Sequence, residues 1–237
     1  MKLITWNCQG AFRKKADVIL KYNPDILVVQ ECEHPSKLIF NSDTKLPKDS
    51  LWVGDNHHKG IGIFSYSKYR FKLLDIYNPN FKTIIPIVVT GGAIDFTLYA
   101  IWANNPQDKK NQYVGQIWKA ISEYDQLLNV GSTILTGDFN SNTIWDRPSR
   151  IGNHSAVVEV LADKKIHSIY HKCFLQIQGQ EKHPTFYLHR DKKKPYHLDY
   201  CFASEDLLSK VKRFKVGTYK NWIEHSDHSP LFVEFNL

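Results

Sequence analysis

The sequence predicts an α/β fold in a single domain spanning residues 1–237. Segments typical of strands alternate with segments typical of helices along the whole chain. Many of the strand segments are continuous apolar runs, which indicates sheets that are covered on both faces. No internal repeat, low-complexity tract or Gly/Ser-rich linker divides the 237 residues, although this length would also accommodate two small domains. One α/β domain is therefore the simplest interpretation.

The first half of the chain is expected to consist mainly of strands. Residues 2–6 and 26–29 are short apolar runs typical of buried strands. A short amphipathic helix is expected at 14–22, and an Asn-Pro-Asp turn at 23–25 separates it from the second strand. Further strand-like segments occupy residues 60–65, 84–89 and 96–102.

The second half of the chain adds longer helices. Helical spacing of apolar residues predicts a helix over 112–128, and residues 155–163 are expected to form another. Between them, the apolar run at 132–135 is expected to form a strand that runs into Asp138. The remaining strands are expected at residues 185–187, 197–202 and 231–235.

The charge of the chain favours a polyanionic partner. The net charge is +7 and the isoelectric point is about 9.1. The excess of basic residues occurs in small clusters at residues 13–15, 109–110, 164–165, 192–194 and 210–215. Each cluster taken alone is well explained as a solvated loop or helix face. Together they favour a polyanionic partner such as nucleic acid.

Nothing in the sequence predicts a secreted or membrane-spanning protein. It has no signal-peptide pattern, and no apolar run approaches the roughly 20 residues that a membrane helix requires. The four cysteines show no Cys-x-x-Cys pairing, and three lie in or beside apolar strand-like segments. They are expected to be reduced core thiols rather than zinc ligands or disulfides. We therefore expect a cytoplasmic protein, and we expect it to be a monomer.

Polar side chains recur where the expected strands begin or end. These residues are Asn7, Glu31, Asp138, Asn140, Asp199, Asp227 and His228. A carboxylate beside a buried strand is costly unless a metal, a proton or a partner compensates it. An α/β sheet assembles a site from distant parts of the chain at its strand ends, and oxygen ligands of this kind suit Mg²⁺ or Mn²⁺. A histidine beside them can stay protonated and donate to a phosphoryl oxygen.

These residues lie in five motifs that resemble, in order, those of the endonuclease/exonuclease/phosphatase superfamily. The motifs are Thr5-Trp6-Asn7, Val29-Gln30-Glu31, Gly137-Asp138-Phe139-Asn140, Leu198-Asp199-Tyr200 and Ser226-Asp227-His228. The segment at 58–65 also resembles the glycine-containing strand of this group. The superfamily includes exonuclease III, abasic-site endonucleases, pancreatic-type deoxyribonuclease, inositol polyphosphate 5-phosphatases and neutral sphingomyelinases. Each motif alone is a weak signal, but their order and spacing make the resemblance specific, and it spans residues 3–237.

The resemblance implies a fold and a metal site. The fold is a four-layer α/β sandwich, in which two mixed β-sheets pack face to face and helices flank them. Glu31 would be the principal ligand of Mg²⁺ or Mn²⁺, with Asn7 nearby in the metal and phosphate site and Asp227 close to the metal. One metal is chemically sufficient, and two are compatible with the motifs.

The resemblance also implies roles in hydrolysis. Asp138 would orient or deprotonate the attacking water, and Asn140 would hold the phosphate. Asp199 would pair with His228 and keep it oriented and charged, so that His228 donates to a non-bridging phosphoryl oxygen. In-line attack on a phosphodiester needs these contributions together with charge neutralisation on the phosphoryl group.

Two positions depart from the family pattern. Abasic-site endonucleases carry an acidic residue where this chain has Gln9. Exonuclease III and its relatives place a tyrosine, and the deoxyribonuclease and phosphatase branches a histidine, where this chain has Trp102. An indole can stack or donate but cannot ionise. Asn104 or Asn105 is therefore expected to supply a polar contact here.

Three further residues are candidates for substrate binding. Arg147 and Arg150 follow the Asp138 motif and could hold a phosphate or a flanking nucleotide, and the competing interpretation is a solvated loop. His197 precedes Asp199 by two residues, and it either points into the cleft or contacts a backbone carbonyl.

The expected function is that of a divalent-metal-dependent phosphodiester hydrolase, with DNA as the preferred substrate. One alternative is a phosphatase or phosphodiesterase of a small phosphorylated molecule or lipid headgroup, which Trp102 and the short chain leave open. The other is a nucleic-acid-binding protein without catalysis. The complete set of acidic, amide and histidine motifs argues against the last of these.

Overall fold

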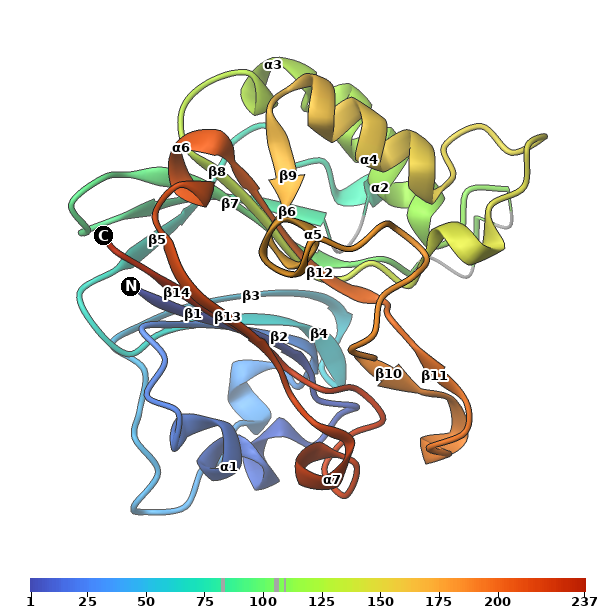
Figure 1. Ribbon diagram of the computed structural model, residues 1–237. Helices are drawn as coiled ribbons and strands as arrows, with labels where there is room; N and C mark the ends of the chain where they lie inside the picture. The colour runs from blue at the N-terminus through green and yellow to red at the C-terminus, as the bar shows by residue number, and fades with distance from the viewer. Residues whose placement is uncertain (82–83, 105–106, 109) are drawn as a thin grey trace.

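Two six-stranded sheets form the centre of the molecule (Figure 1). The computed structural model describes residues 1–81, 84–104, 107–108 and 110–237. The β1 sheet has the order β13-β14-β1-β2-β4-β3, with bounds Val211–Val216, Leu231–Phe235, Lys2–Asn7, Ile26–Cys32, Lys59–Ser65 and Asp49–Asn56. The β8 sheet has the order β5-β6-β7-β8-β12-β9, with bounds Arg70–Leu73, Ile84–Thr90, Phe96–Trp102, Thr133–Asp138, Asp199–Ser204 and Ile166–Ser168.

Each sheet contains one parallel pair of strands among antiparallel neighbours. In the β1 sheet the parallel pair is β1 with β2, and in the β8 sheet it is β7 with β8. The carboxyl ends of parallel strands lie at the same edge of a sheet. The strand ends that carry Asn7 and Gln30 therefore lie together, and those that carry Trp102 and Asp138 also lie together.

Alternating side chains divide the apolar residues of each sheet between two faces. Leu3 of β1 faces the other sheet, and Ile4 beside it faces outward. The layer between the sheets includes Leu3, Val28, Ile63, Leu98, Ala100, Ile134, Cys201 and Val233. The two sheets thus share one buried apolar layer.

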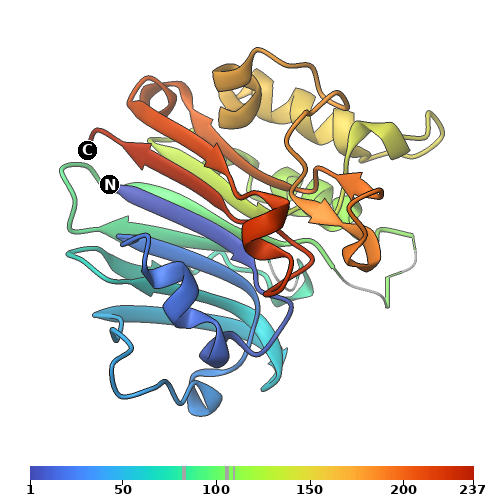
Figure 2. The same ribbon diagram turned by 60° about the horizontal axis from the view of Figure 1, so that its bottom comes forward.

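Helices cover both outer faces, which confirms the four-layer sandwich (Figures 1 and 2). Over the β8 sheet lie α2 (Val114–Glu123) and α4 (His154–Asp163), whose buried apolar residues pack with Leu135 and Tyr200. Over the β1 sheet lie α1 (Ala16–Leu20) and α7 (Tyr219–Trp222), where Ile19 and Trp222 pack with Ile4.

The remaining elements are short. They are the 3₁₀ turns η1 (Phe12–Lys14), η2 (Pro35–Lys37), η3 (Pro79–Phe81), η4 (Thr143–Trp145) and η5 (Leu188–Arg190), the helices α3 (Asp125–Leu128), α5 (Ile169–Phe174) and α6 (Glu205–Leu208), and a hairpin of β10 (Phe186–Tyr187) with β11 (Pro195–Tyr196). In the described part of the chain, no helix combines the length and the apolar character needed to cross a membrane.

Several boundaries differ from those expected from the sequence. The helix expected over 112–128 is divided into α2 and α3 at Tyr124, and the helix expected at 14–22 is the turn η1 followed by α1. Spacing alone does not reveal the break at Tyr124, because apolar residues continue on both sides of it. The strand expected at 197–202 begins at Asp199, since His197 lies before the pairing with β8.

Candidate active site

The sheet register places two buried carboxylates opposite each other. Asp138 at the end of β8 pairs with Asp199 at the start of β12, and Trp102 at the end of β7 lies beside Asp138 in the parallel pair. Asp138 is 0% exposed and Asp199 is 2% exposed. Two carboxylates buried this deeply require compensating partners.

His228 provides the first compensation. Its Nδ1 atom lies 2.8 Å from Oδ2 of Asp199, and its Nε2 atom lies 3.9 Å from Oδ2 of Asp138. The backbone that leads to His228 is also fixed, because the His228 amide donates to Ser226 Oγ at 3.0 Å and Ser226 Oγ donates to the carbonyl of Asn7 at 2.7 Å. The imidazole is therefore held in one orientation between the two carboxylates.

The neighbouring charges change the protonation of this cluster. Burial alone would lower the pKa of His228, but the carboxylates of Asp199 and Asp138 outweigh it and raise that pKa to about 10. Burial and, to a smaller extent, the charge of Asp199 raise the pKa of Asp138 to about 7, although His228 and the hydrogen bonds from Asn7 and Asn140 act to lower it. The imidazole is thus a cation at neutral pH that can donate from Nε2.

Asn140 and Asn7 hold the carboxylate of Asp138. The backbone amide of Asn140 donates to Oδ1 at 2.9 Å, and its side-chain amide donates to Oδ2 at 3.0 Å and to the carbonyl of Ala103 at 3.0 Å. Asn140 has a φ of +47°, a left-handed conformation that asparagine tolerates. Asn7 donates from the opposite sheet to Oδ2 of Asp138 at 2.9 Å.

A bulge in β2 directs Glu31 toward the same end of the molecule. The pairing of β2 with β4 shifts register between Gln30 and Cys32, and Glu31 has a φ of +58°. A bulge with a strained backbone re-aims a side chain, and such strain is concentrated at functional sites. Oε1 of Glu31 accepts from Asn7 Nδ2 at 3.4 Å, and Oε2 lies 2.5 Å from Lys59 Nζ.

Asp227 joins the cluster through Gln9. The Gln9 side chain donates to Oδ2 of Asp227 at 2.7 Å, and its backbone amide donates to Oδ1 of Asn7 at 3.0 Å. Arg190 donates to Oε1 of Gln9 at 2.5 Å. Burial raises the pKa of Asp227, the charge of Glu31 adds to the rise, and His228 opposes it. The amide of Gln9 therefore bridges an arginine and a carboxylate.

The donor set at this end suits a divalent cation. Its oxygen atoms come from carboxylates and amides, which are the ligands that Mg²⁺ and Mn²⁺ prefer. Asp138, Asp199 and His228 also offer ligand atoms that all lie within 4.8 Å of one another. Nδ1 of His228 already contacts Asp199 and is not free to bind an ion. The better candidates to hold the ion are therefore Glu31, Asn7 and Asp227. Glu31 and Asp227 lie close enough for the charge of one to raise the pKa of the other.

The other predicted site residues have different surroundings, although Trp102 lies beside Asp138 in the parallel pair. Trp102 packs in part against the apolar layer between the sheets, the carbonyl of Asn104 accepts from Tyr113, and Asn105 lies outside the described residues. His197 is buried with Nδ1 2.7 Å from the carbonyl of His183, and burial lowers its pKa to about 4.

The two predicted arginines also lie elsewhere. Arg150 donates to the carbonyl of Gln112 at 2.7 Å, and Arg147 is exposed in the loop after η4. The structure shows no contact between these side chains and the carboxylate cluster within the described ranges.

Other residues of the site were not predicted from the sequence. Lys59 pairs with Glu31, and Thr185 Oγ1 accepts from the amides of Leu198 and Asp199 at 2.9 and 3.0 Å. Thr185 therefore fixes the start of β12 and with it Asp199. The sequence around Lys59 and Thr185 gives no local signal of these roles, because a lysine in a strand of mixed polarity and a threonine before an aromatic residue are both common.

A row of aromatic rings leads away from His228. The ring of Phe186 lies 4.7 Å from the imidazole, the ring of Tyr196 lies 6.4 Å from Phe186, and the ring of Trp145 lies 5.0 Å from Tyr196. Trp145 is 49% exposed at the end of this row. Exposed rings of this kind can stack with nucleic-acid bases.

Comparison with known proteins identifies the family. The sequence profile described as the Endonuclease/Exonuclease/phosphatase family matches residues 4–228. The chain belongs to this family. With its buried Asp/Asp/His cluster, it is a phosphoesterase of the endonuclease/exonuclease/phosphatase type. A comparison with curated proteins gives no sequence match.

Solved structures of the same fold include three nucleic-acid enzymes. An AP endonuclease from Archaeoglobus fulgidus is 18% identical, with a TM-score of 0.72. The 3′ phosphatase NExo from Neisseria, bound to a product DNA hairpin, is 21% identical with a TM-score of 0.68. The 3′-5′ exonuclease NExo from Neisseria meningitidis is 21% identical with a TM-score of 0.67. Each of the three covers 100% of this chain and is itself covered over 100% of its length.

Proposed function

We propose that this protein is a divalent-metal-dependent nuclease that hydrolyses phosphodiesters in DNA. The observation that carries the proposal is the buried imidazole of His228, whose Nδ1 atom contacts Asp199 and whose Nε2 atom faces the carboxylate of Asp138. The net charge of +7 and the aromatic row that starts at Phe186 support a nucleic-acid substrate. The DNA hairpin bound to the Neisseria 3′ phosphatase supports DNA.

The residues of the site divide the work of in-line hydrolysis. Asp138 accepts a proton from the attacking water, whose oxygen forms the new bond to phosphorus. His228 donates from Nε2 to a non-bridging oxygen and stabilises the charge that develops there, while Asp199 keeps the imidazole oriented. The bond from phosphorus to the leaving oxygen then breaks, and its electron pair remains on that oxygen.

Glu31, Asn7 and Asp227 would hold Mg²⁺ or Mn²⁺. A cation bound there supplies charge neutralisation for the phosphoryl group and for the leaving oxygen. In the structure both N–H bonds of the Asn140 side chain are used, so Asn140 first of all positions Asp138. Contact of its amide with the phosphate requires that one of these hydrogen bonds be exchanged.

Hydrolysis assays test the proposal directly. Plasmid DNA, an abasic duplex, single-stranded RNA and a chromogenic phosphodiester are incubated with Mg²⁺, Mn²⁺ or EDTA. We expect metal-dependent cleavage of the DNA substrates, and loss of this activity in Asp138→Asn and His228→Ala. Asp163→Asn and His225→Ala are the matched controls, because Asp163 is exposed at the end of α4 and His225 lies outside the cluster.

The other outcomes each reject a part of the proposal. Cleavage of the chromogenic ester alone would reject the nuclease and favour a phosphoesterase of small molecules or lipid headgroups. Activity in EDTA, or activity that survives both substitutions, would reject the mechanism. DNA binding without hydrolysis of any ester would show that the chain binds nucleic acid without catalysis.

The cysteines support a cytoplasmic location, which we include in the proposal. All four are free thiols, and Cys8, Cys32 and Cys201 are buried. Free thiols of this kind are usual in a reducing compartment.

A further inference from the structure

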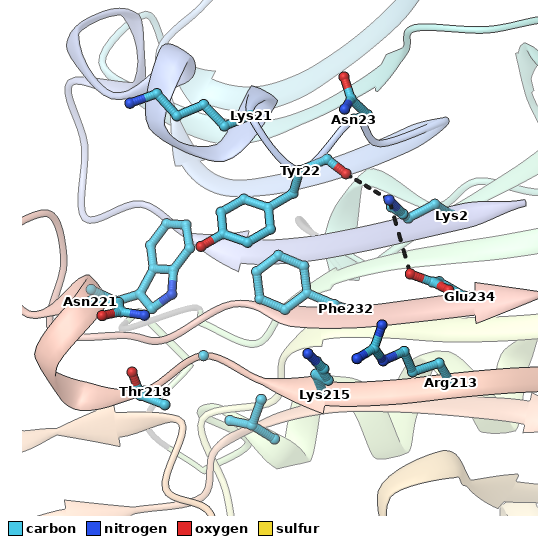
Figure 3. Close-up of a pocket in the computed structure, with 13 residues that line it drawn as sticks. Lys2, Lys21, Tyr22, Asn23, Arg213, Lys215, Thr218, Asn221, Phe232 and Glu234 are labelled. Atoms are coloured by element: carbon cyan, nitrogen blue, oxygen red, sulfur yellow. Dashed lines mark hydrogen bonds and ion pairs between the residues drawn. The ribbon is translucent and has the colours of Figure 1, made fainter.

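A pocket lies on the outer face of the β1 sheet (Figure 3). It has a volume of about 460 Å³ and lies between the end of α1 and the segment from β13 to α7. Phe232 and Trp222 in its wall belong to the outer apolar cluster, whereas Asn7 extends from the inner face of the same sheet. The sheet therefore separates this pocket, which we call the outer pocket, from the carboxylate cluster.

The outer pocket carries an excess of positive charge. Lys21, Arg213 and Lys215 line it, are exposed, and form no ion pair with any described residue. The one acidic residue in its described lining is Glu234, which Lys2 approaches at 4.0 Å. The cations of such a pocket favour an anionic ligand.

The register of the edge strand explains why two of these cations point the same way. β13 pairs with β14 so that Arg213 lies opposite Glu234 and Lys215 lies opposite Phe232. Side chains on directly opposed residues share one face of an antiparallel pair. Arg213 and Lys215 are thus placed beside each other along the wall of the pocket, as Figure 3 shows.

Aromatic rings form the rest of the wall. The ring of Tyr22 lies 4.8 Å from Phe232 and 5.7 Å from Trp222, and Tyr22 is 40% exposed. Thr218 and Asn221 add exposed polar groups at the rim. An apolar ring wall beside unpaired cations complements a ligand that joins a planar ring to an anion.

We propose that the outer pocket binds a nucleotide unit, with its base against Tyr22 and its phosphate at Arg213 and Lys215. The volume lies within the range of about 300–1,000 Å³ that is typical of small-molecule sites. A free nucleotide and a nucleotide within a single strand present the same chemistry. The proposal does not depend on hydrolysis at the carboxylate cluster.

Calorimetric titration in EDTA tests the outer pocket without the metal. The probes are AMP, adenosine, inorganic phosphate and an eight-residue oligothymidylate. We expect AMP to bind more tightly than adenosine or phosphate, and Arg213→Gln/Lys215→Gln to weaken it by at least about tenfold, because two charge-assisted contacts are lost. Tyr22→Leu should weaken AMP but leave phosphate unchanged.

The matched control is Lys212→Gln/Lys220→Gln, which removes the same charge from exposed residues that do not line the pocket. It should retain AMP binding. An equal loss in this control would show diffuse electrostatic attraction and overturn the proposal, as would unchanged binding in the Arg213/Lys215 variant. If AMP binds most tightly, the ligand of the outer pocket is a free nucleotide. If only the oligonucleotide binds, the ligand is a nucleotide within a single strand.

Two controls separate this proposal from the nuclease proposal. Turnover of the chromogenic phosphodiester should be the same in all these variants, since none of the substituted residues contacts the carboxylate cluster. Thermal unfolding of each variant shows whether it is folded. If no ester is hydrolysed, the nuclease proposal is rejected. The nucleotide-binding proposal is still decided by the calorimetric titrations alone.

Discussion

At the scale of single residues, the site depends on groups whose partners are far away in the chain. Asp199 and His228 are 29 residues apart, and Asn7 and Asp138 are 131 apart, yet each pair is joined by a hydrogen bond. The residue types and their positions at strand ends predicted these groups. The bridges made by Gln9 and Lys59 could not be predicted, because the sequence pattern does not specify which distant side chain an exposed amide or ammonium meets.

Asp199 should act as a positioning residue for His228. An amide at this position keeps a hydrogen-bonding group but removes the charge that stabilises the imidazolium. We expect Asp199→Asn to lower kcat on the chromogenic phosphodiester by about a hundredfold or more, with little change in KM. Steady-state kinetics measure this, and Asp163→Asn should match the wild type. A change confined to KM would contradict the assigned role.

Gly137 should be required by the backbone of the site. It has a φ of +139°, and a Cβ atom there would lie 1.9 Å from the carbonyl oxygen of Ile101. Gly131 also has a positive φ, +73°, but a Cβ atom there meets nothing within 4 Å. We expect Gly137→Ala to lower the free energy of unfolding by roughly 3 kcal/mol or more, and Gly131→Ala by about 1 kcal/mol. Urea denaturation compares them, and equal losses would contradict the steric argument.

At the scale of elements, the sequence predicted the central strands and missed all four sheet edges. Strands β13, β3, β5 and β9 lie at the edges of the two sheets, and none was expected. β13, β3 and β5 are partly exposed and carry charged residues, which limits unwanted pairing with other chains and hides their apolar pattern, whereas β9 has only three residues. The basic residues 210–215, whose sequence by itself suggests a solvated segment, largely form the edge strand β13.

Short helices were also missed from the sequence. Helices of four to six residues such as α5, α6 and α7 are too short to show a helical period.

The first turn of α4 should make the stability of the protein depend on pH. His154 is buried, its Nδ1 lies 2.8 Å from Ser141 Oγ and its Nε2 lies 3.3 Å from the Gln178 side chain. Burial is the main cause that lowers the pKa of His154 to about 4, against the opposing effects of the Gln178 hydrogen bond and of Asp146 and Glu181.

The sign of this dependence follows from proton uptake. Below a pH of about 6.5 the unfolded chain protonates this histidine and the folded chain does not, so stability is lost as pH falls toward about 4. We expect the wild type to lose about 2 kcal/mol more than His154→Asn between pH 7 and pH 5. Urea denaturation at the two values measures this difference. Parallel losses in the two proteins would show that His154 is not the group responsible.

At the scale of the whole molecule, the sandwich brings a site together from both sheets. The β1 sheet contributes Asn7 and Glu31, and the β8 sheet contributes Asp138 and Asp199. The order of the motifs predicted the family and the four layers. It did not predict the outer pocket, because Tyr22, Arg213 and Phe232 come together only when β13 and β14 pair beside the end of α1.

The basic charge of the molecule should make its action on DNA sensitive to salt. A protein that neutralises DNA phosphates releases condensed counterions, so the logarithm of its affinity falls linearly with the logarithm of salt concentration. With a net charge of +7, we expect duplex affinity, measured in EDTA by fluorescence anisotropy, to fall at least about tenfold between roughly 50 and 200 mM salt. Turnover of the chromogenic ester should change by less than about twofold, since its single phosphate releases few counterions. An equal salt dependence for both would mean that salt acts on the carboxylate cluster itself, and would remove charge complementarity as an argument for a DNA substrate.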